Sequence, residues 1–333
     1  MASHRMTLPI AATAVVALGL GGCQRWLAEP ETAAARGSGL TLSAQLTEGE
    51  DPAADLRTLM DSMNVVLEAE GANYRVAIAE YITDEAGFNG QDTVLAKNVG
   101  NKRLGADFIP GDPRRNGWSG VTPDGAVDNI TYAIDRTGDA VPVFPLVGGL
   151  TAAQTDAAIV RAVTTWENVE CSTVGLTRNN DFGLDIGVVA FQNSLGGSPF
   201  IFADVQHAGW RDINFAGGIL GVTFTFVFIN AAGPTDNDGN GLADVAFREI
   251  YFDPSFNWRD DGVGNVDVQT VALHEFGHGL SQGHFGMIAL KNDGSLKASP
   301  RAVMNALYAG PFRVLVGTDN GGHCGNWETW PTN

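Results

Sequence analysis

HEFGHGLSQGH, residues 274–284, is the stretch of sequence that carries the most chemical information. On a helix, His274 and His278 lie one turn apart on the same face, so both imidazoles can bind one metal ion. Two glycines in the second half of the stretch allow the chain to leave the helix and reverse, which can bring His284 to the same ion. Three neutral imidazoles with one open position are typical of a catalytic zinc site, whereas structural zinc sites are closed and usually contain cysteine.

Glu275 follows the first histidine and indicates the reaction at this site. Its carboxylate can reach a zinc-activated water without binding the metal, take up a proton and deliver it to the leaving amine. The sequence therefore predicts Glu275 as the general base and acid, and His274, His278 and His284 as the zinc ligands. The alternatives are three solvated histidines on a surface helix, or a zinc site without turnover.

A second motif, AVMNALY at residues 302–308, places Met304 twenty residues beyond His284. Together the two motifs resemble the zinc-binding consensus and the Met-turn of the metzincin peptidases. A tyrosine four residues after the methionine, as Tyr308 is here, makes the chain most similar to the matrixins. The resemblance covers residues 126–310. It implies that Met304 forms a floor beneath the zinc and that Tyr308 walls the pocket for the side chain after the cleaved bond.

The resemblance also implies an α+β fold, in which a twisted five-stranded mixed sheet lies over an active-site helix. A polypeptide substrate would bind as an added antiparallel strand along the edge at residues 219–224. The periodicity of the sequence predicts helices at residues 155–169 and 267–280, and strands at residues 130–134, 184–190, 219–229 and 249–252. A small N-terminal region precedes them, with a helix at residues 55–70 and a strand at residues 74–83. It is a propeptide, an accessory domain or an extension of the next sheet, and the sequence leaves all three open.

Several positions depart from the matrixin pattern. Ser281 stands where matrixins have a glycine in a left-handed turn, and Phe285 replaces the small hydroxyl residue after the third histidine. Val222 and Tyr251 occupy the positions of two structural-zinc ligands, so we expect no second zinc and interpret His207 as an ordinary loop histidine. No cysteine between the tether and the catalytic domain can serve as a cysteine switch, so any latency has another cause. The tail after residue 311 does not resemble the matrixin C-terminal helix.

A calcium site is predicted in DNDGNGLAD, residues 236–244, because oxygen donors recur there at the spacing of a calcium loop. Position 12 of the loop is Phe247, and the carboxylate expected there comes two residues late, at Glu249. The alternative is a solvated Asx-Gly turn. The predicted calcium ligands are Asp236, Asp238, Asn240, the Leu242 carbonyl, Asp244 and Glu249.

Residues 1–22 read as an export signal whose apolar run is too short to span a bilayer. LGGC at residues 20–23 resembles the bacterial lipobox, so we expect lipidation at Cys23 and anchoring to the cell envelope; an ordinary cleaved signal is the alternative. Residues 23–53 form a tether, residues 54–125 the N-terminal region with a linker, and residues 126–333 the peptidase domain. An oxidising compartment allows a disulfide between Cys171 and Cys324, and two separately buried thiols are the alternative.

Composition excludes several classes of protein. A hydrophobic share of 44% is enough for a buried core, which excludes intrinsic disorder, and a net charge of −18 repels nucleic acids. We expect a monomer that contacts the membrane only through Cys23. The function predicted is a zinc metalloendopeptidase that acts on extended polypeptides. A non-catalytic surface binding protein with the metzincin fold, and zinc-dependent hydrolysis of a non-peptide polymer, are the alternatives.

Overall fold

The computed structural model describes residues 52–84, 94–98, 103–118, 129–135, 149–179, 183–213, 215, 218–264, 266–291 and 293–332. All of them fall in the second of two units of the chain, Gly37–Asn333. The predicted signal sequence, the lipidation site Cys23 and nearly all of the predicted tether lie outside the described residues. No helix in the described ranges combines the length and apolar character needed to cross a bilayer.

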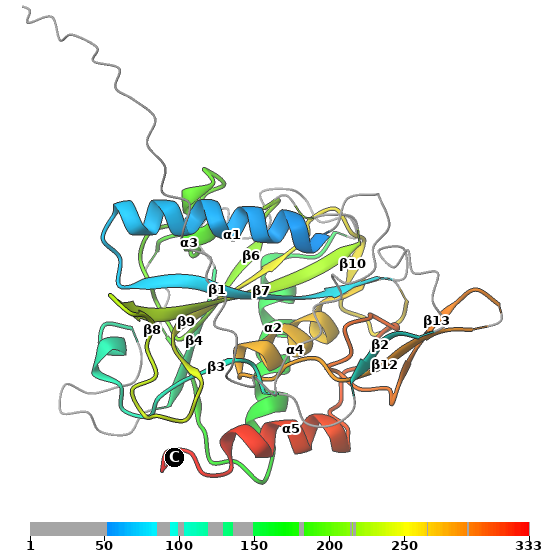
Figure 1. Ribbon diagram of the computed structural model, residues 1–333. Helices are drawn as coiled ribbons and strands as arrows, with labels where there is room; N and C mark the ends of the chain where they lie inside the picture. Colours follow the sequence, from blue (N-terminus) through cyan, green and yellow to red (C-terminus); the bar gives the residue numbers. More distant parts are fainter. Residues whose placement is uncertain are drawn as a thin grey trace, which may run out of the picture. The chain divides into compact units, whose positions relative to one another are not determined.

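A mixed sheet of eight strands organises these residues, so the predicted α+β class is confirmed, whereas the expected number of five strands is too small (Figure 1). Strands β1, β7 and β9 are antiparallel neighbours, whereas β9, β6, β4 and β5 run parallel. Two short strands extend the sheet, β3 (Ala106–Asp107) beside β9 and β8 (Gly233–Pro234) beside β7. The main path runs through β1 (Tyr74–Thr83), β7 (Ile219–Asn230), β9 (Ala243–Phe252), β6 (Val205–Trp210), β4 (Ile130–Ile134) and β5 (Leu176–Arg178).

Helices cover both faces of the sheet (Figure 1). Helix α1 (Pro52–Ala69) and the short α3 (Val188–Gln192) pack on one apolar cluster, and α2 (Ala152–Glu167) and α4 (Val268–Gly279) pack on the other. Alternation along β7 explains this division, since successive side chains of a strand point to opposite faces. Phe224 and Phe226 face the α1 side, whereas the hydroxyl of Thr223 reaches α4.

The remaining elements lie around this layered core. Strands β10 (Trp258–Arg259) and β11 (Val266–Asp267) form a parallel pair just before α4. A three-stranded sheet joins β13 (Leu296–Ser299), β12 (Gly286–Leu290) and β2 (Val94–Asn98). The chain also forms a short 3-10 helix η3 (Pro113–Arg115) and ends in helix α5 (Gly317–Trp327).

The predicted strand at residues 184–190 is wrong, because the chain forms α3 at Val188–Gln192. A residue distant in the sequence stabilises this helix. Glu249, buried in β9, accepts hydrogen bonds from the backbone N–H groups of Val188 and Val189 at 2.7 and 3.1 Å. A carboxylate at these first free N–H groups stabilises a helix start, and the local apolar pattern gives no sign of it.

Residues 105–118 belong to a stretch, residues 105–126, whose composition indicates a loop or linker, but they pack against the sheet. β3 pairs with β9 there, and the Arg115 side chain of η3 is fully buried against Asp204, with 2.9 Å between Nε and Oδ1. The N-terminal strand β1 continues the same sheet by pairing with β7. Three interpretations of the N-terminal region were open. The pairing of β1 with β7 agrees with the third of them, an extension of the next sheet.

Helix α5 was not predicted, and three contacts fix it to the rest of the fold. Cys171 and Cys324 form a disulfide with 5.6 Å between their Cα atoms. The Trp327 indole N–H donates to the carbonyl of Leu280, at the end of α4, at 2.8 Å. His323 stacks on Trp166 of α2, with 5.5 Å between the ring centroids. The tail therefore closes over the end of α4.

His323 is expected to make stability depend on pH. Burial lowers the pKa of its imidazole from 6.5 to about 4, so the unfolded chain takes up a proton at a higher pH than the folded chain does. The free energy of unfolding is therefore unaffected by protonation of His323 above pH 6.5. It falls as the pH is lowered from 6.5 toward 4, by about 3 kcal/mol in total. Denaturant unfolding of the parent and of His323→Gln over this pH range isolates the effect as a difference between two curves. Parallel curves would contradict it.

Candidate metal centre

Helix α4 and the turn after it bring His274, His278 and His284 together. The Nε2 atoms of His274 and His278 lie 3.0 Å apart, and each lies 3.1 Å from the Nε2 of His284. The first two side chains are fully buried, and His284 is 17% exposed. The structure therefore gathers the three predicted ligands around one point.

Each of these histidines has an acceptor at its other ring nitrogen. His274 Nδ1 lies 2.7 Å from the Val303 carbonyl, and His278 Nδ1 lies 2.7 Å from the Gln282 carbonyl. His284 Nδ1 lies 3.1 Å from a carboxylate oxygen of Glu80 on β1. An Nδ1–H bonded to an acceptor leaves the lone pair on Nε2, and this arrangement orients a metal-binding histidine. All three lone pairs then face one another, an arrangement that a bound cation would stabilise.

Burial keeps two of the ligands neutral. Desolvation lowers the pKa of His274 and of His278 well below 6.5, and the neighbouring His284 lowers both further. A histidine must be neutral to bind a metal ion, because the proton and the metal compete for the same lone pair. At neutral pH the site therefore needs no deprotonation of these two rings before it binds a cation.

Glu275 lies on α4 next to the first ligand and is fully buried. Its Oε2 accepts a hydrogen bond from the Thr223 hydroxyl of β7 at 2.6 Å. Burial raises the pKa of the Glu275 carboxyl well above 4.5 and the charge of Glu80 raises it further, whereas the Thr223 hydroxyl and the backbone N–H of Ile82 lower it. A carboxyl in such an environment holds a proton more readily than an ordinary glutamate does. This property suits a residue that must take up and return a proton.

Ser281 makes the left-handed turn between the second and third ligands, with φ of +66°. This conformation is costly for a residue other than glycine, so neighbouring groups must hold it. The buried guanidinium of Arg248 donates to Ser281 Oγ at 3.0 Å and to the Gly279 carbonyl at 2.9 Å. Leu104 N–H donates to the Ser281 carbonyl at 2.9 Å. These bonds fix the chain reversal that returns His284 to the site.

The predicted Met-turn lies against α4. Met304 is fully buried, and a Cβ atom on Gly277 would overlap its sulfur, so the glycine allows this close approach. Asp319 of α5 accepts hydrogen bonds from the backbone N–H groups of Val303 and Met304, both at 3.1 Å. Asp319 thus fixes the backbone whose carbonyl receives His274 Nδ1. Sequence reasoning missed this positioning residue, because nothing near it indicates a helix.

Tyr308 is buried and contacts two different elements. Its hydroxyl accepts a hydrogen bond from the backbone N–H of Asp267, the N-cap of α4, at 2.9 Å. Its backbone N–H donates to the carbonyl of Thr83 on β1 at 2.7 Å. The edge of β7 at residues 219–224, expected to receive substrate, is paired with β1 along its length. The chain's own N-terminal strand therefore lies where a polypeptide strand was expected.

The loop predicted to bind calcium brings together the carboxylates of Asp236, Asp238 and Asp244, with ligand atoms within 4.8 Å of one another. Asn240 joins them through hydrogen bonds to Asp238 and to Asp107, both at 3.0 Å. Asp107, on β3, was not predicted, and its buried Oδ1 has no hydrogen-bond partner.

One of the predicted calcium ligands, Glu249, does not join this cluster. The Glu249 carboxylate is instead buried, and accepts hydrogen bonds from α3 and from the Tyr251 hydroxyl at 2.8 Å. Leu242 lies beside Asn240, because its backbone N–H donates to the Asn240 side chain at 2.8 Å.

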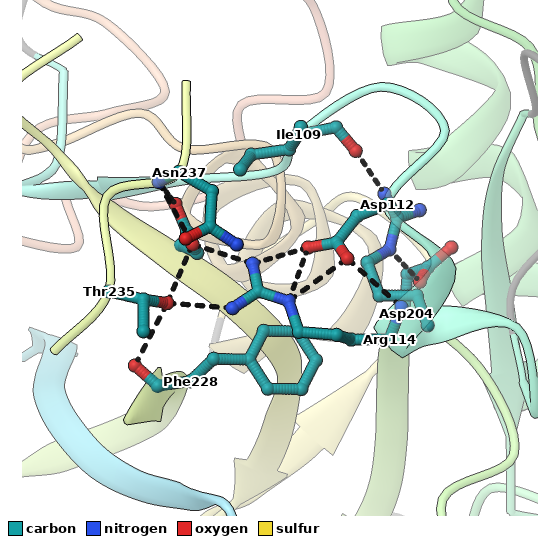
Figure 2. Close-up of polar contacts among 9 residues, drawn as sticks. Ile109, Asp112, Arg114, Asp204, Phe228, Thr235 and Asn237 are labelled. Carbon is teal, nitrogen blue, oxygen red and sulfur yellow. Dashed lines mark hydrogen bonds and ion pairs between the residues drawn. The ribbon is translucent and has the colours of Figure 1, made fainter. Parts of the chain in front are cut away.

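Arg114 closes the opposite side of this loop (Figure 2). Its guanidinium donates to Asp112 and to Asp244, each at 2.6 Å, and to the Thr235 hydroxyl at 2.7 Å. The aromatic ring of Phe228 lies 4.2 Å from the guanidinium carbon. Asp244 is therefore already neutralised by a cation of the chain, whereas Asp236 and Asp238 are exposed.

His207 is not a loop histidine, because it lies in β6 and is fully buried. Its ring packs edge-on against Phe252, with 4.5 Å between centroids, and its Nδ1 accepts from the Gly209 N–H at 3.2 Å. Burial lowers the pKa of this imidazole to about 3. Tyr251 bonds to Glu249 rather than pointing toward His207.

No protein-family model matches the chain, and no curated protein sequence matches it significantly. The functional interpretation therefore depends on the residues and on their geometry.

Proposed function

We propose that this chain is an exported zinc metalloendopeptidase of the matrixin-like metzincin type. The observation that carries the proposal is the set of three histidine Nε2 atoms, 3.0 to 3.1 Å apart, beside the buried carboxylate of Glu275. The close packing of Met304 against Gly277 of α4 supports it as well.

Zinc fits the donor set better than other common ions. Zinc binds histidine nitrogen at about 2.0–2.1 Å, so two nitrogens of a tetrahedral site lie about 3.3 Å apart. The observed separations of 3.0 to 3.1 Å are close to this value. A set of three imidazoles, with no protein ligand at the fourth position among the described residues, is characteristic of catalytic zinc. Bound zinc would supply a Lewis acid that activates water and polarises a carbonyl.

The chain's own residues would perform the remaining chemistry. Glu275 accepts the proton of the attacking water and returns it to the amine that leaves. Thr223 holds the carboxylate in place through its 2.6 Å hydrogen bond. Once β1 is displaced, the N–H and C=O groups of β7 with which it now pairs would bind an extended polypeptide as an added strand, which orients one peptide bond against Glu275.

The test measures zinc content and peptide cleavage by the full chain. We expect one zinc per chain and zinc-dependent hydrolysis of a quenched-fluorescence peptide mixture, abolished by a chelator and restored by added zinc. Because β1 lies on the binding edge, the assay includes the variant with β1 loosened that is described below. Zinc binding without cleavage by either form would contradict the proposal and favour a non-catalytic binding protein.

We further propose calcium at the loop of Asp236, Asp238 and Asn240. The support is the buried Oδ1 of Asp107, which has no hydrogen-bond partner and lies on the residue that Asn240 contacts. Oxygen-only donors with several carboxylates suit calcium. Calcium at about 100 times its Kd is expected to stabilise the fold by about 3 kcal/mol, measured as a rise in thermal midpoint. Asp238→Ala should remove this rise, and an equal rise in that variant would contradict the site.

A further inference from the structure

We propose that β1 is a built-in occupant of the peptide-binding edge, so that a polypeptide substrate binds only after the chain displaces its own strand. The inference rests on the proposed function, because it names how the same site is regulated. Three independent sets of contacts support it: along β7, on the opposite side at the Met-turn segment, and at the chemical groups of the site.

The first set is the pairing of β1 with β7. β1 is antiparallel to β7, and the partners run from Tyr74 opposite Phe228 to Thr83 opposite Ile219. This is the direction and the location expected for a bound substrate. An edge strand offers one row of free N–H and C=O groups, and one added strand uses all of it. A peptide substrate and β1 therefore exclude each other on this edge.

The second set lies on the other side of β1, at residues 306–308. Thr83 N–H donates to the Ala306 carbonyl at 3.1 Å, and the Thr83 carbonyl accepts from Tyr308 N–H at 2.7 Å. The same residue forms a parallel bridge with Leu307. The end of β1 thus lies in a slot with hydrogen-bonding backbone on both sides. We call this space between β7 and residues 306–308 the strand slot.

The third set places β1 over the reacting groups. The backbone N–H of Ile82 acts on the Glu275 carboxylate, and Glu80 Oε2 lies 3.1 Å from His284 Nδ1. Ile82 is opposite Gly221, and a Cβ on that glycine would lie only 3.2 Å from Glu275. β1 therefore contacts both the general base and the third metal ligand. Displacing β1 would also remove the acceptor that orients His284.

The two halves of β1 have different neighbours. In the first half, both backbone polar groups of Val76 bond to the side chain of Asn64 on α1, at 2.8 and 2.9 Å. In the second half, Tyr81 and Ile82 are buried, one in each apolar cluster, and this half covers the metal-site residues of α4 and the turn after it. Loosening the second half would expose these two side chains and open the strand slot, while the bonds between Val76 and α1 remain. A strand tethered in the same chain competes at an effective concentration of about 1 mM, so short peptides bind weakly until it is loosened.

The experiment loosens the second half with the double variant Thr83→Pro, Asp84→Pro. Proline has no N–H, so the variant lacks the bonds from Thr83 to Ala306 and from Asp84 to Gly218, which measure 3.1 and 2.9 Å. The matched control is Ala77→Pro, because Ala77 is exposed and lies at an irregularity of the ladder with no partner on β7. Zinc content and thermal midpoint establish that each variant folds.

The probe is a fluorescent peptide of sequence YRVAIAEYITD, which copies residues 74–84. Its binding is measured in a Glu275→Ala background, so that the result does not depend on catalysis. We expect at least tenfold tighter binding to the double variant than to the parent or to Ala77→Pro, and no binding of a scrambled peptide. With Glu275 present, kcat/KM for peptide cleavage should rise at least tenfold in the double variant.

The outcomes separate this inference from the proposed function. A folded, zinc-loaded double variant that binds the probe no tighter than the parent overturns the inference. Tighter binding without cleavage supports the inference and contradicts the proposed hydrolysis. Equal cleavage by the parent and both proline variants supports hydrolysis and overturns the inference.

If the double variant does not fold, hydrogen exchange on the unmodified chain tests whether a peptide displaces β1. Hydrogen exchange at the amides of Thr83 and Asp84 is followed while the unlabelled peptide is added at millimolar concentration. The inference predicts that these amides lose protection while the amides of α4 keep theirs. Equal protection with and without the peptide would overturn it.

Discussion

Replacing Glu275 by alanine is expected to lower kcat/KM for peptide hydrolysis by about 10²- to 10⁴-fold while zinc stays bound, which is the usual contribution of a general acid–base group. Zinc should remain because Glu275 is not one of the three converging histidines, and their Nδ1 contacts involve other residues. Steady-state kinetics and zinc analysis of the parent and the variant, both with β1 loosened, provide the measurement.

Glu275→Gln is the matched control for shape. Its amide oxygen can still accept the hydrogen bond that Thr223 donates, but the amide cannot take up the proton of the attacking water. We expect the same loss of turnover as in Glu275→Ala. Activity of either variant within threefold of the parent would show that this carboxylate is not the general base.

Glu275→Gln is expected to be more stable than the parent, although it is less active. Burial raises the pKa of the Glu275 carboxyl well above 4.5, so its charged form is disfavoured in the folded chain at neutral pH. The contribution of such a group to stability improves as the pH falls, because the folded state then binds more protons than the unfolded state. Glu275→Gln removes this cost and should raise the thermal midpoint at pH 7. A more stable but inactive variant is typical of a residue kept for function.

The sequence predicted the parts of the fold that have a local pattern. The alternation of Phe224, Phe226 and Phe228 with threonines indicates β7, and the spacing of His274 and His278 on a helix indicates the metal site. Each of these two patterns lies within one element. One face of β7 is apolar and buried, and one face of α4 carries the two histidines. The boundaries of β1 and β4 were predicted for the same reason.

Other parts depend on contacts between distant residues, which no local pattern shows. Helix α5 contains four glycines in GTDNGGHCGNW, each of which disfavours a helix by about 1 kcal/mol relative to alanine. It forms where the Cys171–Cys324 disulfide and the Asp319 bonds to the Met-turn hold it. Glu80 likewise reaches His284 only because β1 pairs with β7. The sequence therefore predicted the three histidines that converge, but not the groups that bond to their other ring nitrogens.

Asp204→Ala is expected to destabilise the fold by about 3–5 kcal/mol, a large part of the 5–15 kcal/mol typical of a folded domain. Asp204 and Arg115 are both fully buried, and their side chains meet at 2.9 Å. The Asp204 carboxylate also accepts from the backbone N–H and the hydroxyl of Thr131, each at 2.9 Å. Its loss would leave a buried guanidinium without this carboxylate and remove the acceptor at the start of β4.

Two control variants separate charge from hydrogen bonding. Asp204→Asn keeps an oxygen acceptor for Thr131 but removes the charge that Arg115 faces, so it should destabilise the fold less than alanine does. Asp156→Ala breaks the ion pair with Arg178, whose side chains are 28% and 20% exposed, and should cost about 0–1 kcal/mol. Denaturant unfolding of the three variants measures the difference.

The ranking of these variants bears on how the N-terminal region is joined to the rest of the chain. η3 carries Arg115, whereas Asp204 immediately precedes β6, so their ion pair fixes residues 103–118 to the parallel part of the sheet. If Asp204→Ala costs no more than Asp156→Ala, this segment is only loosely attached. If it costs several times more, the segment is a structural part of the folded unit and stays in place when β1 is displaced.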